Sequence, residues 1–389
     1  MVTKINENTI KINGKIDSNN AAEFEKNLLS AAGANYTDIT LDAAGLEYIS
    51  SAGLRVLLKL KKGTKGKVSV INVSYEIYDI FNVTGFDNIL DVKKALRELS
   101  VDKMEVIGRG LTGSVYRADK ETVIKVFNKN VNFDMITDER AKAQNAFVFG
   151  VPTAISYDMV RVGESYGLVY ELLDAKDLLD VIVNDKANLE EYIKKFALKM
   201  REMHSIEADD GFVDIKTVTV NYLGFLEGKV CTADEVEKMR AVIKNIPERN
   251  TFIHGDAHIG NVMLQDGEFM FIDLSGAGKG HPIFDMVSMC LVFNLGQTVD
   301  EETRKNSELM RWFDMDEMKL MWDTYIGTYL GNDDKVIIEK ANEQITAVAC
   351  VRALMATAAI PGHFSEELIA FFKNTAIAHY DKGLEPICF

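Results

Sequence analysis

The first hundred residues alternate between strand-like and helix-like patterns of hydrophobic and polar positions. Apolar and polar side chains alternate over Thr9–Ile16, as they do in a half-buried strand. N-cap groups follow at Asp17–Asn20, before an amphipathic stretch over Ala21–Ala31. The same patterns predict further strands over 38–42 and 67–72, and helices over 51–62, 75–83 and 92–99. Repeated β-α units predict an α/β domain over residues 1–100, with a sheet backed by helices.

From about residue 104 the pattern changes to consecutive strands around a glycine-rich segment. Three glycines, Gly108, Gly110 and Gly113, fit the spacing G-x-G-x-x-G-x-V. Dinucleotide-binding folds use similar glycines, but there the glycines lead into a helix, whereas residues 114–118 continue as a strand. The segment therefore predicts a glycine hairpin whose backbone amides approach phosphates without Cβ clashes.

A further strand over 122–127 carries Lys125. This is the position from which a kinase lysine neutralises the α- and β-phosphates. Its partner should be an acid on the following helix. Glu139 is predicted, with Asp138 as the nearest alternative. The other interpretation of Lys125 is an ordinary lysine on an edge strand.

The apolar residues 167–169 lead into a segment that predicts a hinge between two lobes. There we expect the backbone of Glu171 and Leu173 to receive the edge of an adenine. A helix is predicted over 192–204, and we interpret His204 at its end as a packed residue rather than a catalytic one.

A second polar cluster accompanies short apolar runs in the second half of the chain. It places Asp256, then Asn261 five positions later, then Asp273 at the end of an apolar run. Kinases use this layout: the first Asp orients and deprotonates a hydroxyl, and the other two side chains hold Mg²⁺ against ATP phosphates. His254 and His258 could instead bind zinc, but their mixture with Asp and Asn oxygens favours Mg²⁺.

Composition narrows the functional classes. The formal net charge is −15, with 47% hydrophobic and 26% charged residues. The charge is uneven, at about +1 over residues 1–100 and about −16 over the rest. Nucleic-acid binding is not expected, because it needs clustered Lys and Arg. An acidic body suits a cationic small molecule, and the alternative is that the acidity serves solubility alone.

Several acids in the C-terminal third could bind such a cation. They could equally be solvated acids at helix starts, which is the interpretation we favour for Asp300, Glu301, Glu302, Asp314 and Asp316. Helices are predicted over 310–330, 335–360 and 364–380.

No membrane span and no secretory signal are expected. The longest apolar run, over 345–360, is interrupted by Arg352 and ends at Pro361, so it predicts a buried helix. The first residues have no apolar block after their charge. Four scattered cysteines show no metal-like spacing, and reduced thiols in a cytoplasm are expected.

The segment from Ala44 to Arg55 resembles the STAS domain of anti-sigma factor antagonists, over roughly residues 1–100. The resemblance implies a regulatory protein partner and a phosphoacceptor serine at a helix start, which matches Ser51. A phosphate there would be favoured by free backbone N–H groups and the helix dipole. This chain departs from the family at Ser50 and Ala52, and the alternative is that a serine here is only an N-cap.

Residues 104–389 resemble the aminoglycoside phosphotransferase and choline kinase superfamily. The signature H-G-D-x-H-x-x-N over 254–261 carries the resemblance, with residues 271–273 and 280–286. It implies an α+β bilobal protein-kinase-like fold, with an N-lobe over 104–173 and a C-lobe over 174–389 that contains the catalytic loop and a helical acceptor-binding region. The resemblance also implies that His254 holds the loop backbone and that Asp285 braces the loop.

The acceptor is predicted to be a hydroxyl of a small molecule. Gly255 stands where a typical protein kinase has Arg, residues 273–276 replace D-F-G, and no A-P-E closure for a peptide substrate follows. Two other hypotheses remain open. In one, the kinase-like half senses nucleotide and Ser51 is the switch for a protein partner. In the other, the phosphotransferase modifies Ser51 itself.

Overall fold

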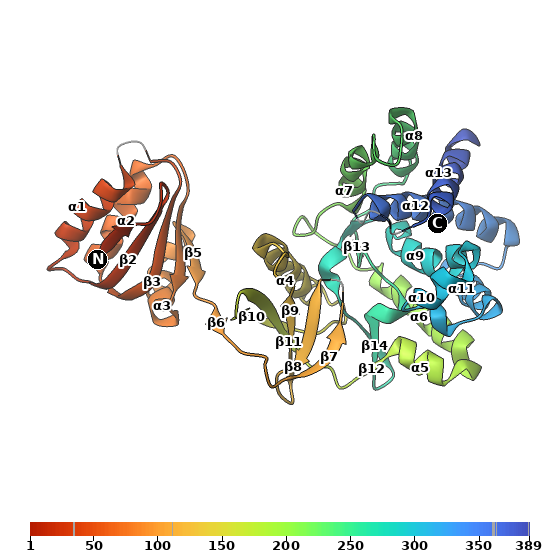
Figure 1. Ribbon diagram of the computed structural model, residues 1–389, viewed down its shortest axis with the longest axis horizontal. Helices are drawn as coiled ribbons and strands as arrows, with labels where there is room; N and C mark the ends of the chain where they lie inside the picture. The colour runs from red at the N-terminus through yellow and green to blue at the C-terminus, as the bar shows by residue number, and fades with distance from the viewer. Residues whose placement is uncertain (34–35, 111, 360–361, 363, 388) are drawn as a thin grey trace. The chain divides into compact units, whose positions relative to one another are not determined.

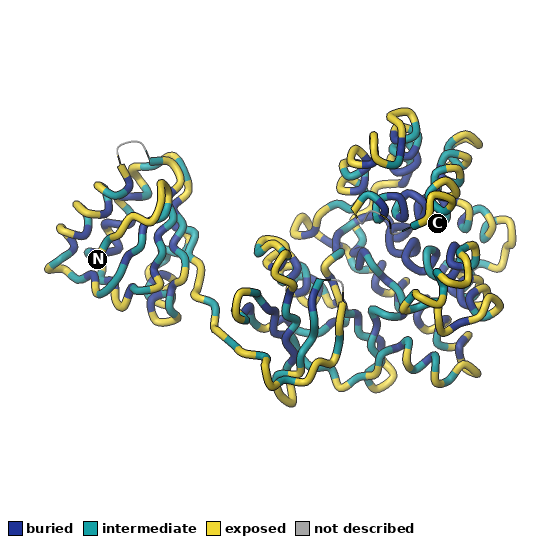
Figure 2. The backbone as a smooth tube through the Cα atoms, viewed as in Figure 1, coloured by how far each residue is buried: buried dark blue, intermediate teal, exposed yellow. Residues whose placement is uncertain are grey.

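The computed structural model describes residues 1–33, 36–110, 112–359, 362, 364–387 and 389. The chain forms two compact units. The first contains Met1–Ser100 and Met159–Glu164, and the second contains Val101–Asp158 and Ser165–Phe389. Both are shown in Figure 1, and buried backbone fills the interior of each in Figure 2.

The first unit is built on a five-stranded sheet in the order β1-β2-β3-β4-β5. The edge strand β1 is antiparallel to β2, and the other neighbours are parallel. Parallel neighbours need crossover connections, and helices supply them here. The α/β prediction is confirmed. The elements are β1 (Val2–Lys4), β2 (Thr9–Ile16), α1 (Ala21–Ala32), β3 (Ile39–Ile49), α2 (Ser51–Gly63), β4 (Val68–Val73), α3 (Tyr75–Val83) and β5 (Asp91–Lys94).

Two sequence predictions in this unit are wrong. The helix predicted over 92–99 is instead the strand β5 followed by the short strand β6 (Arg97–Glu98). Backbone pairing of β5 with β4 overrides the local helical pattern, and Asp91 is held there by Ser69 Oγ at 3.0 Å. The strand predicted to end at residue 42 continues to Ile49, because β3 stays paired with β2 as far as Ile16.

The second unit begins with the strands that carry the glycine hairpin. Within this unit the strands follow the order β11-β9-β8-β7, and the pairs β7–β8, β8–β9 and β9–β11 are antiparallel. The helix α4 follows β9 in the chain. The elements are β7 (Glu105–Arg109), β8 (Gly113–Arg117), β9 (Thr122–Phe127), α4 (Phe133–Val148), β10 (Ser156–Val162) and β11 (Ser165–Glu171).

The rest of this unit is mostly helical and has one continuous core. Fully buried side chains such as Phe196, Tyr325 and Leu354 come from distant parts of the chain. The elements are β12 (Lys176–Asp177), α5 (Leu178–Asn184), α6 (Leu189–Met203), α7 (Ile215–Tyr222), α8 (Ala233–Lys244), β13 (Thr251–Ile253), β14 (Val262–Gln265), β15 (Glu268–Phe271), β16 (Gly278–Gly280), α9 (Ile283–Met289), α10 (Glu301–Asn306), α11 (Met315–Leu330), α12 (Lys335–Ala359) and α13 (Glu366–Asp381).

The apolar run near the C-terminus belongs to α12, which is buried along much of its length. Its predicted end at Ile360 and Pro361 lies outside the described residues, as does Cys388. The other three cysteines are free and buried. Across the described residues, no helix is long and apolar enough to cross a membrane.

Candidate active site

The glycine hairpin connects β7 and β8. It is closed by a hydrogen bond from Gly110 N to Gly113 O at 2.9 Å. A Cβ at Gly113 would lie 2.1 Å from Val126 O on β9, so a side chain cannot be accommodated there. Gly108 is the first glycine of the motif, and Leu111 lies outside the described residues. Position 113 is therefore a glycine because the backbone of β9 packs directly against it.

Lys125 on β9 lies between two acids. Its Nζ is 2.8 Å from Glu139 Oε1 on α4 and 3.4 Å from Asp273 Oδ1. Asp138, the alternative partner, instead pairs with Lys142 at 2.8 Å. Burial raises the pKa of the Glu139 carboxyl, and the Lys125 ammonium opposes that rise. The ammonium therefore bridges the helix α4 and the acid at the end of β15.

The loop that carries Asp256 runs from the end of β13 to the start of β14. Gly255 adopts a φ of +85°, and a Cβ there would lie 2.1 Å from Gly276 O. Both observations exclude a side chain at this position. The glycine that replaces the protein-kinase arginine is thus required by the close contact between this loop and the segment that follows Asp273.

One buried carboxylate holds this loop. Asp285 on α9 accepts hydrogen bonds from His254 N at 2.8 Å and Gly255 N at 2.6 Å. His204 Nε2 lies 3.0 Å from the same carboxylate, and its Nδ1 lies 2.7 Å from Tyr329 Oη. Asp285 is completely buried. A buried charge with three donors is a strong positioning element, because every donor loses its partner if the charge is removed.

His254 extends the network to the strand that ends at Asp273. Its side-chain Nε2 lies 3.0 Å from Ile272 O. Ile272 N in turn donates to Asn261 O at 3.0 Å. His254 Nδ1 accepts from Asp256 N at 3.3 Å, so the ring donates to Ile272 O through Nε2, and burial lowers the pKa of His254. The loop and the strand end are therefore fixed relative to each other by two adjacent peptide groups.

Asn261 and Asp273 are the predicted pair of ligands for a hard cation. Asn261 Nδ2 donates to Asp256 O at 2.9 Å, and within the described residues no donor bonds to its Oδ1 oxygen. Asp273 has a φ of +57°, and 44% of its side chain is exposed. Both residues thus offer an oxygen that protein donors leave accessible, which fits Mg²⁺.

The Asp273 carboxylate is kept ionised. Burial acts to raise its pKa, but the Lys125 ammonium, hydrogen bonds involving Ser275 and the charge of His254 together lower the pKa below its usual value. No group of three or more His, Cys, Asp or Glu in the described part of the chain forms a ready metal cage.

Asp256 is surrounded by donors on both carboxylate oxygens. Oδ1 lies 3.3 Å from Ser288 Oγ and 3.3 Å from Arg352 Nη2, and Oδ2 lies 3.4 Å from Asn261 Nδ2 and 3.6 Å from His258 Nε2. Burial acts to raise the pKa of Asp256, but the hydrogen bond and charge of His258, with the charges of Arg352 and His254, hold it well below its usual range. The carboxylate is therefore ionised at neutral pH.

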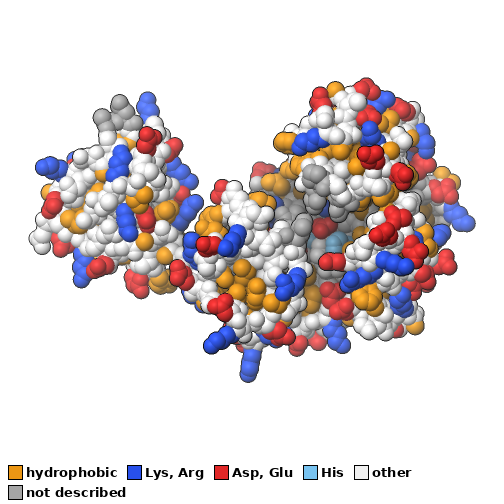
Figure 3. All heavy atoms as spheres, in the orientation of Figure 1, with side chains coloured by type: hydrophobic (Ala, Val, Ile, Leu, Met, Phe, Trp, Pro, Cys, Tyr) orange, Lys and Arg blue, Asp and Glu red, His pale blue; other side chains and the backbone are white. Residues whose placement is uncertain are grey.

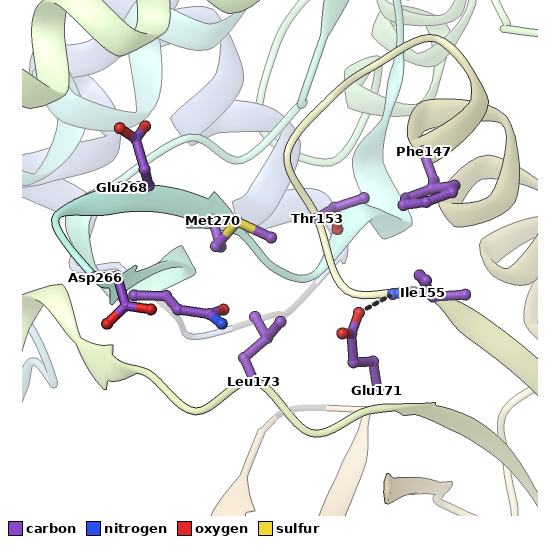
Figure 4. Close-up of a pocket in the computed structure, with 9 residues that line it drawn as sticks. Phe147, Thr153, Ile155, Glu171, Leu173, Asp266, Glu268 and Met270 are labelled. Atoms are coloured by element: carbon purple, nitrogen blue, oxygen red, sulfur yellow. Dashed lines mark hydrogen bonds between the residues drawn. The ribbon is translucent and has the colours of Figure 1, made fainter. Parts of the chain in front are cut away.

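The hinge residues line a separate pocket of about 420 Å³. Glu171 N donates to Ile155 O at 2.9 Å, and Glu171 Oε2 accepts from Ile155 N at 3.2 Å. Figure 4 shows this pocket between the hinge, the end of α4 and the β14–β15 turn, with Leu173 at one wall. Lys125 and Asp256 do not line it. Glu171 and Leu173 thus lie at the expected strand exit, while the pocket itself is not part of the Asp256 cluster.

Three of the five acids considered for cation binding have local contacts. Asp300 caps α10 through Thr303 N at 2.8 Å, and Asp314 caps α11 through Glu317 N at 2.8 Å. Glu301 pairs with Lys305 at 2.6 Å. These are solvated acids at helix starts, in line with the favoured interpretation. Figure 3 shows a hollow in the second unit with a histidine side chain in it and acidic side chains nearby.

Three contacts of this site are not predicted by the spacing of residues in the sequence. Ser288 and Arg352 reach Asp256 from α9 and α12, and His204 reaches Asp285 from the end of α6. The interpretation of His204 as a packed residue is incomplete, because its ring also connects Asp285 to α11. The one available signal for Arg352 was its place as a charged residue inside the apolar run 345–360.

Comparison with known proteins identifies both parts of the chain. A profile of the phosphotransferase enzyme family matches residues 103–320, and a STAS domain profile matches residues 1–99. The putative anti-sigma factor antagonist BtrV of Bordetella bronchiseptica is 31% identical over 84 residues, covering 21% of this chain and 72% of that protein.

Several solved structures are similar to the larger part of this chain. A choline/ethanolamine kinase family protein from Mesorhizobium loti is 15% identical, covering 72% of this chain and 87% of that one, with a TM-score of 0.45. Choline kinase from Cryptosporidium parvum Iowa II is 15% identical, covering 73% and 92%, with a TM-score of 0.47. The gentamicin-APH(2")-IIa complex is 12% identical, covering 79% and 96%, with a TM-score of 0.45.

The two predicted resemblances and the predicted fold class are confirmed. The phosphotransferase profile spans more than half of the chain. The protein therefore belongs to the phosphotransferase enzyme family and carries an N-terminal STAS domain.

Proposed function

We propose that this phosphotransferase uses ATP and Mg²⁺ to phosphorylate a hydroxyl group of a small molecule. The observation that carries the proposal is the convergence of four groups. Asp256, Asn261, Asp273 and Lys125 are brought together by one hydrogen-bonded network, centred on the buried Asp285. Carboxylate and amide oxygens beside an ammonium group are the set that phosphoryl transfer requires.

In the proposed reaction, the acceptor oxygen forms a bond to the γ-phosphorus of ATP. The bond from that phosphorus to the β–γ bridging oxygen breaks, ADP leaves, and the hydroxyl proton passes to the Asp256 carboxylate. Because the transition state is loose, Asp256 acts mainly by orienting the hydroxyl, which is compatible with its low pKa. Bound Mg²⁺, held by Asn261 and Asp273, would neutralise phosphate charge, as would Lys125.

The hinge is assigned a nucleotide-binding role within this proposal. The carbonyl of Glu171 and the amide of Leu173 would receive the edge of the adenine, and the Gly108, Gly110 and Gly113 hairpin would cover the phosphates. Support comes from the position of Glu171 at the end of β11 and from the short hairpin closed at Gly110 and Gly113.

The test is phosphoryl transfer from ATP across a panel of amines, sugars and nucleosides. Asp256→Asn should lower transfer about 100-fold or more, since it removes the orienting carboxylate without changing its size. Asp316→Asn is the control, because Asp316 is an exposed acid in the first turn of α11. If the two variants behave alike and both transfer phosphate at the wild-type rate, the proposal fails.

A signalling function has one specific observation in its favour. Ser50 is the N-cap of α2 and accepts from Gly53 N, which leaves the neighbouring Ser51 exposed at the first position of the helix. A phosphate there would meet free backbone N–H groups. In this alternative the kinase-like half senses nucleotide, and Ser51 is a phosphorylation switch for a regulatory protein partner of the STAS domain.

Intact-mass measurement after incubation with ATP separates these ideas. Added phosphate that disappears in Ser51→Ala would support self-modification of the STAS domain. Added phosphate that survives this substitution would exclude it. A switch operated by another kinase predicts no added mass with ATP alone, but one added phosphate on Ser51 in protein isolated from its own cells.

A further inference from the structure

The long helix α12 brings a guanidinium group to the carboxylate that we assign as catalytic. Arg352 Nη2 lies 3.3 Å from Asp256 Oδ1, although the two residues are 96 positions apart. The side chain of Arg352 is 36% exposed. It therefore stands at a boundary between the core and solvent, directly beside the group that would receive the acceptor hydroxyl.

Most of the hydrogen-bonding capacity of Arg352 is unused. A guanidinium carries five N–H donors in a rigid planar fork. Among the described residues, the bond to Asp256 is the one that its side chain makes, and it is long for a charged pair. The fork can therefore take a second anion, and its geometry matches the two oxygens of a carboxylate or a phosphate.

The two edges of the Asp256 carboxylate face different partners. Oδ2 lies near Asn261, the proposed Mg²⁺ ligand, whereas Oδ1 lies near Ser288 and Arg352. Arg352 is thus on the edge away from the proposed metal. In a phosphotransferase that edge faces the acceptor rather than the nucleotide, because the metal is bound to the nucleotide phosphates.

Three of the acids considered for cation binding already have local partners. Asp300, Glu301 and Asp314 are engaged by helix-cap or lysine contacts, as described above. An ammonium group next to the acceptor hydroxyl would meet the Arg352 charge at short range. The net charge of −15 acts from farther away, and salt screens charges beyond about 10 Å at 0.1 M ionic strength.

We propose that Arg352 determines acceptor specificity by binding a carboxylate or phosphate group that lies near the hydroxyl to be phosphorylated. This inference rests on the proposed phosphotransferase function and narrows its acceptor to hydroxy acids or phosphorylated alcohols. It replaces the cationic acceptor that the net charge suggested. The oxyanion would dock on the free N–H groups of the guanidinium while the neighbouring hydroxyl donates to Asp256.

The first experiment separates a metabolite extract of the cells that make this protein into cationic, neutral and anionic fractions by ion exchange at neutral pH. Each fraction is incubated with labelled ATP and either wild type or Asp256→Asn. Asp256-dependent product is expected from the anionic fraction. Product from only the cationic or neutral fraction would overturn the role of Arg352 and keep the phosphotransferase. No Asp256-dependent product from any fraction would overturn both proposals.

The second experiment measures KM and kcat for the anionic acceptor with Arg352→Gln and Arg352→Lys. Loss of a hydrogen-bonded charge predicts a rise in acceptor KM of about 10- to 100-fold for glutamine, with partial recovery for lysine. Hydroxy acids and sugar phosphates are assayed separately, since they distinguish a carboxylate from a phosphate. Arg240→Gln is the control, because it makes the same charge change on α8, where Arg240 pairs with Glu237.

A purely structural role for Arg352 makes a different prediction. If Arg352 only holds Asp256 in place, both substitutions should lower kcat for every acceptor by the same factor and leave the acceptor KM and the charge preference unchanged. That result would overturn the specificity role.

Discussion

At the scale of single residues, two adjacent acids on α4 have different contacts. Glu139 is buried and bonds Lys125, whereas Asp138 is exposed and pairs with Lys142. We expect Glu139→Gln to raise the KM for ATP by about 10-fold, because a neutral amide no longer fixes the ammonium that would contact the phosphates. Asp138→Asn should stay close to wild type, since exposed ion pairs contribute little. Equal effects in ATP-dependence assays would contradict the assigned pairing.

The contacts that could be predicted from the sequence are those between residues with a characteristic spacing along the chain. Asp256 and Asn261 are five positions apart in one loop, so their proximity is local. Arg352 approaches the same carboxylate only because α12 packs beside α9 in the folded core. No spacing rule connects positions 256 and 352, so a sequence pattern could mark the arginine as unusual but could not say what it contacts.

At the scale of elements, Asp285 connects α9 to the loop that carries Asp256 and, through His204 and Tyr329, to the ends of α6 and α11. In Asp285→Asn the backbone N–H of either His254 or Gly255 would face the amide NH₂ group instead of a carboxylate oxygen. We expect destabilisation of about 2 kcal/mol or more and a fall in kcat of at least about 10-fold. Urea unfolding and transfer assays measure the two effects.

Tyr329→Phe provides a graded control for this network. It removes only the outermost hydrogen bond, to His204 Nδ1, and leaves the bonds of Asp285 to the loop intact. Its effects on stability and kcat should be clearly smaller than those of Asp285→Asn. The bracing role would be contradicted if Asp285→Asn lost stability but kept wild-type kcat.

His281, just before α9, should make stability depend on pH. Its Nδ1 accepts from Ile283 N at 3.2 Å, and Nε2 lies 3.1 Å from Phe389 O, so the folded protein favours the neutral ring. Burial, followed by the charge of Arg249, lowers its pKa to about 4. The unfolded chain takes up this proton near its ordinary pKa of 6.5, so stability is complete above that pH and falls as the pH drops towards 4.

The expected loss across this window is about 3 kcal/mol. The measurement is urea unfolding between pH 4 and 8 for wild type and His281→Asn. Asn retains an acceptor for Ile283 N but does not titrate. The difference in unfolding free energy between the two proteins should be flat above about pH 7 and shrink on acidification. Parallel curves over the whole range would show that His281 does not titrate in this way.

The prediction of helices and strands succeeded where the hydrophobic periodicity was strong. It failed where pairing with another strand determined the structure. The helix α1 and the strand β9 were predicted within one residue of their bounds, since their patterns are long or flanked by clear turns. Residues 92–99 are amphipathic enough for a short helix, yet β4 offers an open edge that takes β5. The secondary-structure propensity of a segment does not show whether another strand has an unpaired edge to which that segment can bind.

At the scale of the whole molecule, each unit has its own hydrophobic core. The buried residues of the first cluster fall between Ile10 and Leu90, and those of the second between Ala143 and Ala376. Separate cores are the physical basis for separate domains, since each can be buried without the other. Two such cores could be expected from the sequence, because the chain is long and its hydrophobic pattern changes near residue 100.

Separate cores predict two calorimetric transitions. Leu57 on α2 and Leu354 on α12 are both fully buried, so alanine at either should cost about 2–5 kcal/mol. Each substitution should move only the transition of its own unit. The shift should be larger for Leu57→Ala, because the same loss of free energy lowers the Tm of a smaller unit by more degrees. If either substitution moves both transitions equally, the units unfold as one and a STAS domain could report directly on the state of the kinase-like core.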